Sequence, residues 1–376
     1  MGSYLILVGV LSMCTICFSQ ECNTELLTNE DFPGTDILHL YAPDAEHCQQ
    51  LCTQHHSCQF FTFLRSDWSR DKRNFYCYLK STPSGEPNSR TALLGVTSGF
   101  SLKPCNQAPP QPCLSNVYQN VDFNGDDYRS FFTGDQEGCQ RACTQDPYCQ
   151  YFTYANDVHT PENIRYKCHL KFSWPVPRTP IVERTAGVVS GFSSKAPMSQ
   201  VSDTACQAKL FPNTAVPGDH LKMFTTATPE HCLSLCSAHP SCTFFAHNSG
   251  NFTCNLKNNP DEMVLKAKAG VTSGIPERFC QLDNSWLTVP QVGIDFRGSD
   301  MRFELMEDAE TCQKTCNEDA YCQFYTYVTS EFHNNDYWKR CYLKRVITMP
   351  SPSKIVKTNN VVSGFHLRNC AKGSGI

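Results

Sequence analysis

Apolar and aromatic residues gather along the chain in four short strings that are copies of one another. They are CQFFTF (58–63), CQYFTY (149–154), CTFFAH (242–247) and CQFYTY (322–327). A second string of the form C-x-L-K follows each of them, at 77–80, 168–171, 254–257 and 341–344. Both kinds of string are aromatic or apolar and partly alternating, which is typical of β-strands.

A helix is predicted before each aromatic string, where cysteines recur as C-x3-C-x5-C. An Asp or Thr stands four residues before the first of these cysteines and a Glu stands two before it, which is a helix start with a capping oxygen and an acid in the first turn. The capping residues are Asp44, Asp135, Thr228 and Asp308. Cysteines at positions i and i+4 then share one helix face.

Each repeat closes with VTSGF, VVSGF, VTSGI or VVSGF, beginning at Val96, Val188, Val271 and Val361. The sequence therefore predicts an α+β protein of four tandem modules, each a small antiparallel sheet packed on one helix. A module of this size buries too little apolar surface to be secure without cross-links, which is a structural reason for the cysteines.

Composition indicates the compartment. The chain has 376 residues with 24 cysteines, 40% hydrophobic and 18% charged residues and a net charge of -4. This is too apolar for disorder and too rich in cysteine for an ordinary cytosolic protein. The near-neutral charge argues against nucleic acid as the main partner.

The amino-terminal run 4–18 is apolar and has no charged residue, so residues 1–19 are predicted to be a secretory signal peptide. A membrane anchor is the alternative, but the run is short for a full span. Removal of the signal takes Cys14 and Cys17 with it. The mature protein is expected to be secreted, with no later segment long enough to cross a membrane.

The remaining cysteines are expected to form disulfides, against the alternatives of zinc binding and thiol catalysis, because the context is secretory and their number is even. The sequence alone does not choose among the many pairings that each repeat allows.

These repeats resemble the apple domains, of the wider PAN group, which form the heavy chains of plasma kallikrein and coagulation factor XI. The resemblance implies four apple domains at 22–105, 113–197, 206–280 and 286–370, packed as a flat disc, and a tail at 371–376. It also implies pairing of first with last, second with fifth and third with fourth cysteine. The implied bonds are Cys22–Cys105, Cys48–Cys77, Cys52–Cys58, Cys139–Cys168, Cys143–Cys149, Cys206–Cys280, Cys232–Cys254, Cys236–Cys242, Cys312–Cys341 and Cys316–Cys322.

Two repeats depart from the family pattern. The second has Cys113 but Pro197 where its closing cysteine should stand, and the fourth has Cys370 but Trp286 at its opening position. Cys113 and Cys370 are therefore left over. We expect them to bond to each other, either across the disc or between two chains of a covalent homodimer, and two buried free thiols are the alternative.

No catalytic residues are predicted. A trypsin-like domain follows the fourth apple domain in those protease relatives, whereas residues 371–376 are all that follow Cys370 here. The chain has no nucleophile segment of the Gly-Asp-Ser-Gly kind, no HExxH metal spacing and no phosphate or calcium loop. A non-enzyme without cofactor or metal is predicted, and a truncated zymogen is the alternative.

The four-apple arrangement without a protease also resembles the kalliklectins, mannose-binding lectins of fish. This implies a secreted lectin of mucosal or humoral innate recognition that binds mannose-type glycans, with repeated weak sites raising its avidity. The alternative is a scaffold that docks a kininogen-like plasma protein or a polyanion in contact activation, for which the basic segment 70–73 is a weak indication.

Sugar recognition needs planar polar groups beside an aromatic face. The loops between the third and fifth cysteines carry such residues in three repeats, namely Asp67, Trp68, Asn156, Asp157, Asn335, Asp336 and Trp338. Ordinary exposed loops are the alternative for all of them. The shorter loop of the third repeat contains the one glycosylation sequon, at Asn251.

Overall fold

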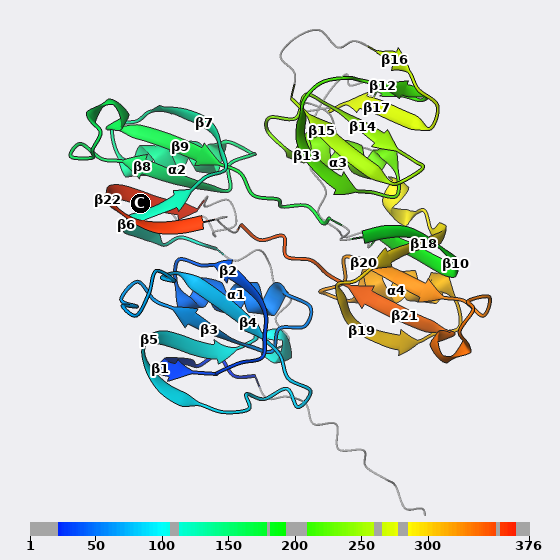
Figure 1. The fold of residues 1–376 in the computed structure, drawn as a ribbon, viewed down its shortest axis with the longest axis horizontal. Coiled ribbons are helices and arrows are strands. Elements are labelled where there is room, and N and C mark those ends of the chain that lie inside the picture. Colours follow the sequence, from blue (N-terminus) through cyan, green and yellow to red (C-terminus); the bar gives the residue numbers. More distant parts are fainter. Residues whose placement is uncertain are drawn as a thin grey trace, which may run out of the picture.

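The computed structural model describes residues 22–105, 113–178, 181–192, 209–258, 265–276, 285–350 and 354–365. Within these ranges the chain forms four α-helices and four five-stranded antiparallel sheets, arranged around a common centre (Figure 1). The predicted α+β class is therefore confirmed. No helix in the described ranges is long and apolar enough to cross a membrane.

Sheet 1 has the strand order β1-β5-β3-β4-β2 and is built from the first repeat alone. Its elements are β1 (Leu26–Asp31), β2 (Asp36–Tyr41), α1 (Ala45–Gln54), β3 (Phe60–Leu64), β4 (Tyr76–Lys80) and β5 (Thr91–Phe100). Sheet 3 has the order β11-β17-β14-β15-β13 and is built from the third repeat alone. Its elements are β11 (Lys209–Phe211), β13 (His220–Thr225), α3 (Pro229–Ala238), β14 (Phe244–Asn248), β15 (Thr253–Lys257) and β17 (Val271–Ile275), beside the short pair β12 (Thr214–Ala215) and β16 (Lys266–Ala267).

The second repeat supplies β6 (Val117–Asn124), β7 (Asp127–Phe132), α2 (Gln136–Gln145), β8 (Tyr151–Ala155), β9 (Lys167–Lys171) and β10 (Ile181–Phe192). The fourth repeat supplies β18 (Gln291–Arg297), β19 (Asp300–Leu305), α4 (Ala309–Glu318), β20 (Phe324–Val328), β21 (Arg340–Lys344) and β22 (Lys354–Phe365). Four short 3-10 helices complete the described elements, at Lys103–Cys105, Glu162–Ile164, Ser285–Thr288 and Asn335–Tyr337.

Each α-helix begins at the residue that the sequence indicates. The Asp44 carboxylate accepts a hydrogen bond from the His47 amide at 2.7 Å, and Asp135, Thr228 and Asp308 make the equivalent bond in the other helices. The cap satisfies an amide that has no partner inside the helix.

Disulfides join each helix to its sheet. The bonds in the described residues are Cys22–Cys105, Cys48–Cys77, Cys52–Cys58, Cys139–Cys168, Cys143–Cys149, Cys232–Cys254, Cys236–Cys242, Cys312–Cys341 and Cys316–Cys322. Cys206, Cys280 and Cys370 lie outside the described residues. Cys113 is disulfide-bonded.

Sheets 2 and 4 exchange their last strands. Sheet 2 has the order β6-β22-β8-β9-β7, so its second strand comes from the fourth repeat, and sheet 4 has the order β18-β10-β20-β21-β19, so its second strand comes from the second repeat. The sequence ranges 113–197 and 286–370 therefore do not each correspond to one sheet. The five residues that end β10 and β22 are the same string, VVSGF, so the local pattern fits either sheet equally.

The crossing segments pass through the middle of the molecule. Residues 172–178 follow β9 on the way to β10, residues 345–350 follow β21 on the way to β22, and these two described segments run past each other between the modules (Figure 1). We call them the crossing connectors.

Helices α1 and α3 are enclosed, whereas α2 and α4 are not. Eight of ten residues of α1 are buried, but only the two cysteines of α2 are. His47 of α1 stacks on Phe365 of β22 with ring centroids 5.1 Å apart, and His231 of α3 packs on Phe192 of β10 at 5.0 Å. Strand β22 of sheet 2 therefore contacts module 1, and strand β10 of sheet 4 contacts module 3. One apolar cluster spans each of these two contacts.

Candidate ligand-binding surfaces

Each sheet has a helix face and an open face. In β4, Cys77 is bonded to Cys48 of α1, so the alternate residues Tyr76 and Tyr78 point to the opposite face. The same alternation holds in β9, β15 and β21. The outer strand pairs are β2–β4, β7–β9, β13–β15 and β19–β21. Each pair therefore presents four equivalent side-chain positions on the open face of its sheet.

In module 1 these four positions are all aromatic. His39 lies opposite Tyr78 and Tyr41 lies opposite Tyr76 across β2 and β4. The His39 and Tyr76 rings are stacked at 5.4 Å and 19°, and Tyr41 contacts Tyr76 at 4.8 Å. Burial and the neighbouring Tyr76 raise the pKa of Tyr41 to about 12, so its hydroxyl stays protonated. We call His39, Tyr41, Tyr76 and Tyr78 the aromatic platform.

The other modules carry different side chains at these positions. Module 2 has Ser130 and Phe132 opposite His169 and Lys167. Module 3 has Met223 and Thr225 opposite Asn255 and Thr253. Module 4 has Phe303 and Leu305 opposite Tyr342 and Arg340. Only modules 1 and 4 therefore place a cross-strand pair of rings on this face of the described sheets.

The loop residues predicted to bind sugar divide into two groups. In module 1 the Trp68 ring is only 6% exposed and its indole N–H donates to Asp71 at 2.8 Å, while the Asp67 carboxylate is ion-paired with Arg65 at 2.9 Å. In module 2 the Asn156 side chain accepts from the Val158 amide, and Asp157 is exposed.

In module 4 the predicted residues Asn335, Asp336 and Trp338 are all exposed, and Tyr337 lies with them. Trp338 and Tyr337 are each 41% exposed, and the Trp338 N–H donates to the Phe332 carbonyl at 2.8 Å. The Arg340 guanidinium lies 4.7 Å from the Tyr337 ring and 4.5 Å from the Phe303 ring, so the loop continues into the open face of sheet 4.

The aromatic platform was missed by the sequence analysis, which looked for sugar-binding residues only in the loops between the third and fifth cysteines. Its signal was the alternation of Tyr76 and Tyr78 around Cys77, because a cysteine bonded to the helix sends its neighbours to the opposite face.

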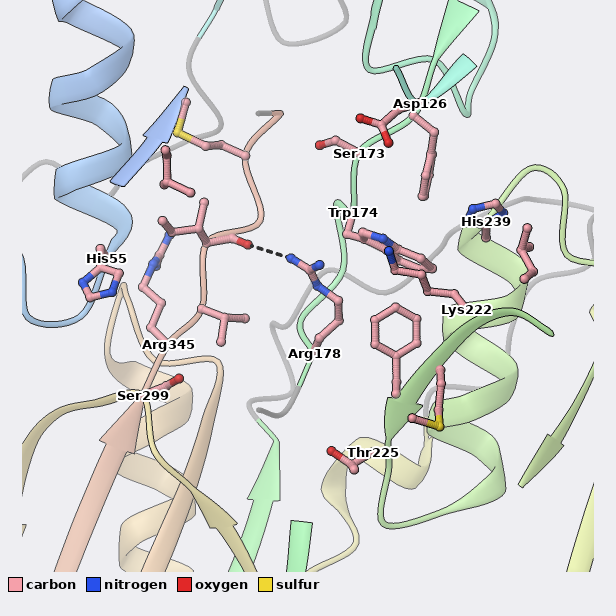
Figure 2. Close-up of a pocket in the computed structure, with 18 of the residues that line it drawn as sticks. His55, Asp126, Ser173, Trp174, Arg178, Lys222, Thr225, His239, Ser299 and Arg345 are labelled. Carbon is pink, nitrogen blue, oxygen red and sulfur yellow. Dashed lines mark hydrogen bonds between the residues drawn. The ribbon is translucent and has the colours of Figure 1, made fainter. Parts of the chain in front are cut away.

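A cavity of about 950 Å³ lies between the four modules, where the crossing connectors meet (Figure 2). Its walls include β2 of module 1, β7 of module 2, β13 of module 3 and both connectors. Arg178 lies near its middle beside Trp174, and its guanidinium donates to the Ile347 carbonyl at 3.4 Å, while Arg345 lies near His55.

Within the described ranges, no three His, Cys, Asp or Glu side chains cluster around a common point. Asn251 of the sequon is exposed in the turn between β14 and β15, and its side chain accepts a hydrogen bond from the Thr253 amide at 3.2 Å.

Comparison with known families identifies the class of protein. A PAN domain model matches residues 17–105, 206–280 and 293–370, and a second PAN domain model matches 121–171. The chain belongs to the PAN-domain family, and the resemblance to tandem apple domains is confirmed.

The relatives include bovine coagulation factor XI, which is 32% identical over 369 residues, covering 93% of this chain and 57% of factor XI. Micronemal protein 4 of Toxoplasma gondii is 25% identical over 221 residues, covering 55% of this chain and 33% of that protein. This chain therefore spans only part of each relative. A solution structure of the two N-terminal apple domains of the latter aligns at 22% identity with a TM-score of 0.16, covering 39% of this chain and 77% of that one.

Proposed function

We propose that the chain is a secreted, non-catalytic binding protein that recognises mannose-type glycans through several weak sites on one rigid body. The aromatic platform is the observation that carries this proposal. A pyranose ring presents a C–H face to an aromatic ring and hydroxyls to polar groups around it, so binding needs rings that are already held in place.

The platform meets both needs. Cross-strand pairing and mutual stacking fix its rings before any ligand arrives, which lowers the entropy lost on binding. Polar groups stand beside the rings, since Arg73 donates to the Tyr78 hydroxyl at 3.1 Å and is itself held by Asp71 at 2.8 Å. These groups can bond hydroxyls at the edge of a stacked sugar.

The second site of the proposal is on module 4, where Phe303, Tyr342, Tyr337 and Trp338 surround Arg340 and the exposed Asp336. Two sites held on one body raise the avidity for a glycan-coated surface far above the affinity of either alone.

The test is capture of the full chain on immobilised mannose with elution by free mannose. Tyr76→Ala should weaken capture by about ten-fold, because the lost stacking is worth roughly 1 kcal/mol or more. Asn255→Ala changes the position of module 3 that is equivalent to Tyr78, outside the sequon, and should leave capture unchanged. Absence of mannose-dependent capture of the unaltered chain would reject the proposal.

A scaffold function is the second candidate, in which the chain docks a kininogen-like protein or a polyanion. It is favoured by Arg70 and Arg73, whose guanidinium groups lie 5.6 and 5.9 Å from the Trp68 ring on an exposed loop. Salt-sensitive retention on heparin or on immobilised kininogen, lost in Arg70→Ala but unaffected by mannose, would favour this function over the lectin.

A further inference from the structure

The central cavity has a chemistry that the open faces lack. Its walls are largely apolar, with Leu40, Phe224, Ile347 and Met349 among the lining residues, and Trp174 adds an aromatic face. Two arginines, Arg178 and Arg345, come from the crossing connectors that meet there.

Neither arginine forms an ion pair within the described residues, although the Asp319 carboxylate, which is ion-paired with Arg302, attracts Arg345 through space. In the part of the chain that the structure describes, no carboxylate lies within ion-pair distance of either guanidinium, and the Nε atom of each is buried without a hydrogen-bond acceptor. Arg345 is only 7% exposed and donates to the Tyr321 carbonyl at 3.0 Å. A buried cation without a counter-charge is unfavourable by several kcal/mol.

The acids in the cavity wall are engaged elsewhere. Asp127 is ion-paired with Lys171, and Asp126 accepts a hydrogen bond from the Tyr151 hydroxyl at 2.9 Å. Burial lowers the pKa of Arg178 and of Arg345 to about 10, so both guanidinium groups remain charged at neutral pH. The cavity therefore combines two arginines that stand outside any described ion pair with apolar side chains in its walls.

We propose that the central cavity binds one amphiphilic anion, whose carboxylate or sulfate head bonds Arg178 and whose hydrocarbon or aryl body packs on Trp174 and the apolar wall. The head supplies an anionic acceptor to the Arg178 guanidinium, whose side chain otherwise bonds only the neutral Ile347 carbonyl among the described residues, and its charge offsets that of the cation. Arg345 strengthens the positive field from the second connector. A cavity of about 950 Å³ is large enough for a ligand of drug or fatty-acid size.

The probe is 8-anilinonaphthalene-1-sulfonate, which combines an aryl body with a sulfonate and fluoresces when it leaves water. We expect saturable fluorescence with one probe bound per chain, and displacement by sodium laurate. Arg178→Met should weaken probe binding by about ten-fold or more, because a charge-assisted hydrogen bond is lost. Arg345→Met should weaken it less.

Arg184→Met is the matched control, since Arg184 is exposed, packs on Phe252 and is not among the residues that line the cavity, and this variant should bind the probe as the unaltered chain does. A comparison of ligands needs no variant. Dodecan-1-ol has the chain of laurate without the charge and should compete at least ten-fold more weakly. Equal competition by the alcohol, unchanged binding in Arg178→Met, or absence of saturable binding would each overturn the proposal.

Discussion

The segment that follows the fourth strand of each sheet behaves differently in module 1 and in modules 2 and 4. In module 1 it is STPSGEPNSR (81–90), which turns back on its own sheet through a bend at Gly85, where φ is +82°. In modules 2 and 4 it is FSWPVPRTP (172–180) and RVITMPSPS (345–353), which cross to the other sheet. The lengths differ by one residue, so length does not decide the path.

Apolar content does distinguish them. Segment 81–90 has no large apolar residue, whereas the crossing connectors contain Phe172, Val176 and Met349, which are 6%, 2% and 2% exposed. Each such side chain stabilises the fold by about 1.5–3 kcal/mol when it leaves water. Burial between the modules is therefore a physical reason for the exchange, and it also builds the central cavity.

The largest effect is expected from a charge placed in a crossing connector. Val176→Asp puts a carboxylate into the buried apolar cluster that contains Phe192 of β10 and Leu287. We expect destabilisation by about 5 kcal/mol or more, measured by urea unfolding. Val158→Asp is the control, because Val158 is 56% exposed and the change should be nearly neutral. Equal effects at both sites would contradict the role of the connector.

The next effect concerns the terminal disulfide of the exchanged sheets. In sheet 1, Cys22 stands four residues before Leu26, Leu26 pairs with Gly99, and Cys105 stands six residues after Gly99. In sheet 2, Cys113 stands four residues before Val117, Val117 pairs with Gly364, and Cys370 follows six residues later in the sequence. Measured along the sequence from the paired strand residues, Cys113 and Cys370 thus have the same offsets as Cys22 and Cys105, which form the bond between the first and last cysteine of module 1.

We therefore expect Cys113–Cys370 to be found within one chain by non-reducing peptide mapping. Cys113→Ser should lower the free energy of unfolding by about 4 kcal/mol, since the bond closes a very long loop. Cys22→Ser removes the Cys22–Cys105 bond of module 1, which closes a shorter loop, and should lower the free energy of unfolding somewhat less. A covalent dimer, or a different partner for Cys113, would contradict the expectation.

A pH effect is expected where the enclosed helices meet the exchanged strands. Burial lowers the pKa of His47 and of His231 to about 4, although Asp44 raises the value for His47 and the Pro177 carbonyl raises it for His231. The unfolded chain binds these protons near pH 6.5, so stability is lost as the pH falls from about 6.5 towards 4.

By pH 5 the loss should be about 2 kcal/mol for each histidine. Urea unfolding of His47→Phe at pH 7 and pH 5 should show a smaller loss than the unaltered chain. His39→Phe, at an exposed position, should show the same loss as the unaltered chain. An equal loss in His47→Phe would exclude His47 as a source.

The smallest expected effect is a difference in hydrogen-exchange rate between sheets 2 and 4. Sheet 4 has Trp286 and Pro197 at the sequence positions where sheet 2 has Cys113 and Cys370, so it lacks the terminal bond. The Phe123 amide donates to Thr153 at 3.3 Å, and the equivalent Phe296 amide donates to Thr326 at 3.3 Å. We expect about ten-fold faster hydrogen exchange in β18 than in β6, and equal rates would contradict this reasoning.

The sequence predicted some residues of the candidate sites and missed others. The exposed residues Asn335, Asp336 and Trp338 were among those proposed, but Trp68 was proposed on the same pattern and is buried against Arg70 and Arg73. Loop composition alone cannot separate these cases, because an aromatic ring in a loop packs inward or outward according to its neighbours in space. The aromatic platform is built from β2 and β4, which are separated in the sequence. Only the pairing register of these two strands shows that its four rings lie side by side.

The amino-acid sequence by itself determined the repeat, the capped helices, the strands and the α+β class, because these depend on spacing and on contacts between near neighbours. Only the tertiary structure decided which strand enters which sheet, because VVSGF fits two sheets equally and the choice depends on where Val176 and Met349 leave water. The central cavity, with Arg178 and Arg345 in its wall, is a consequence of this strand exchange, because it forms only where residues of different modules come together.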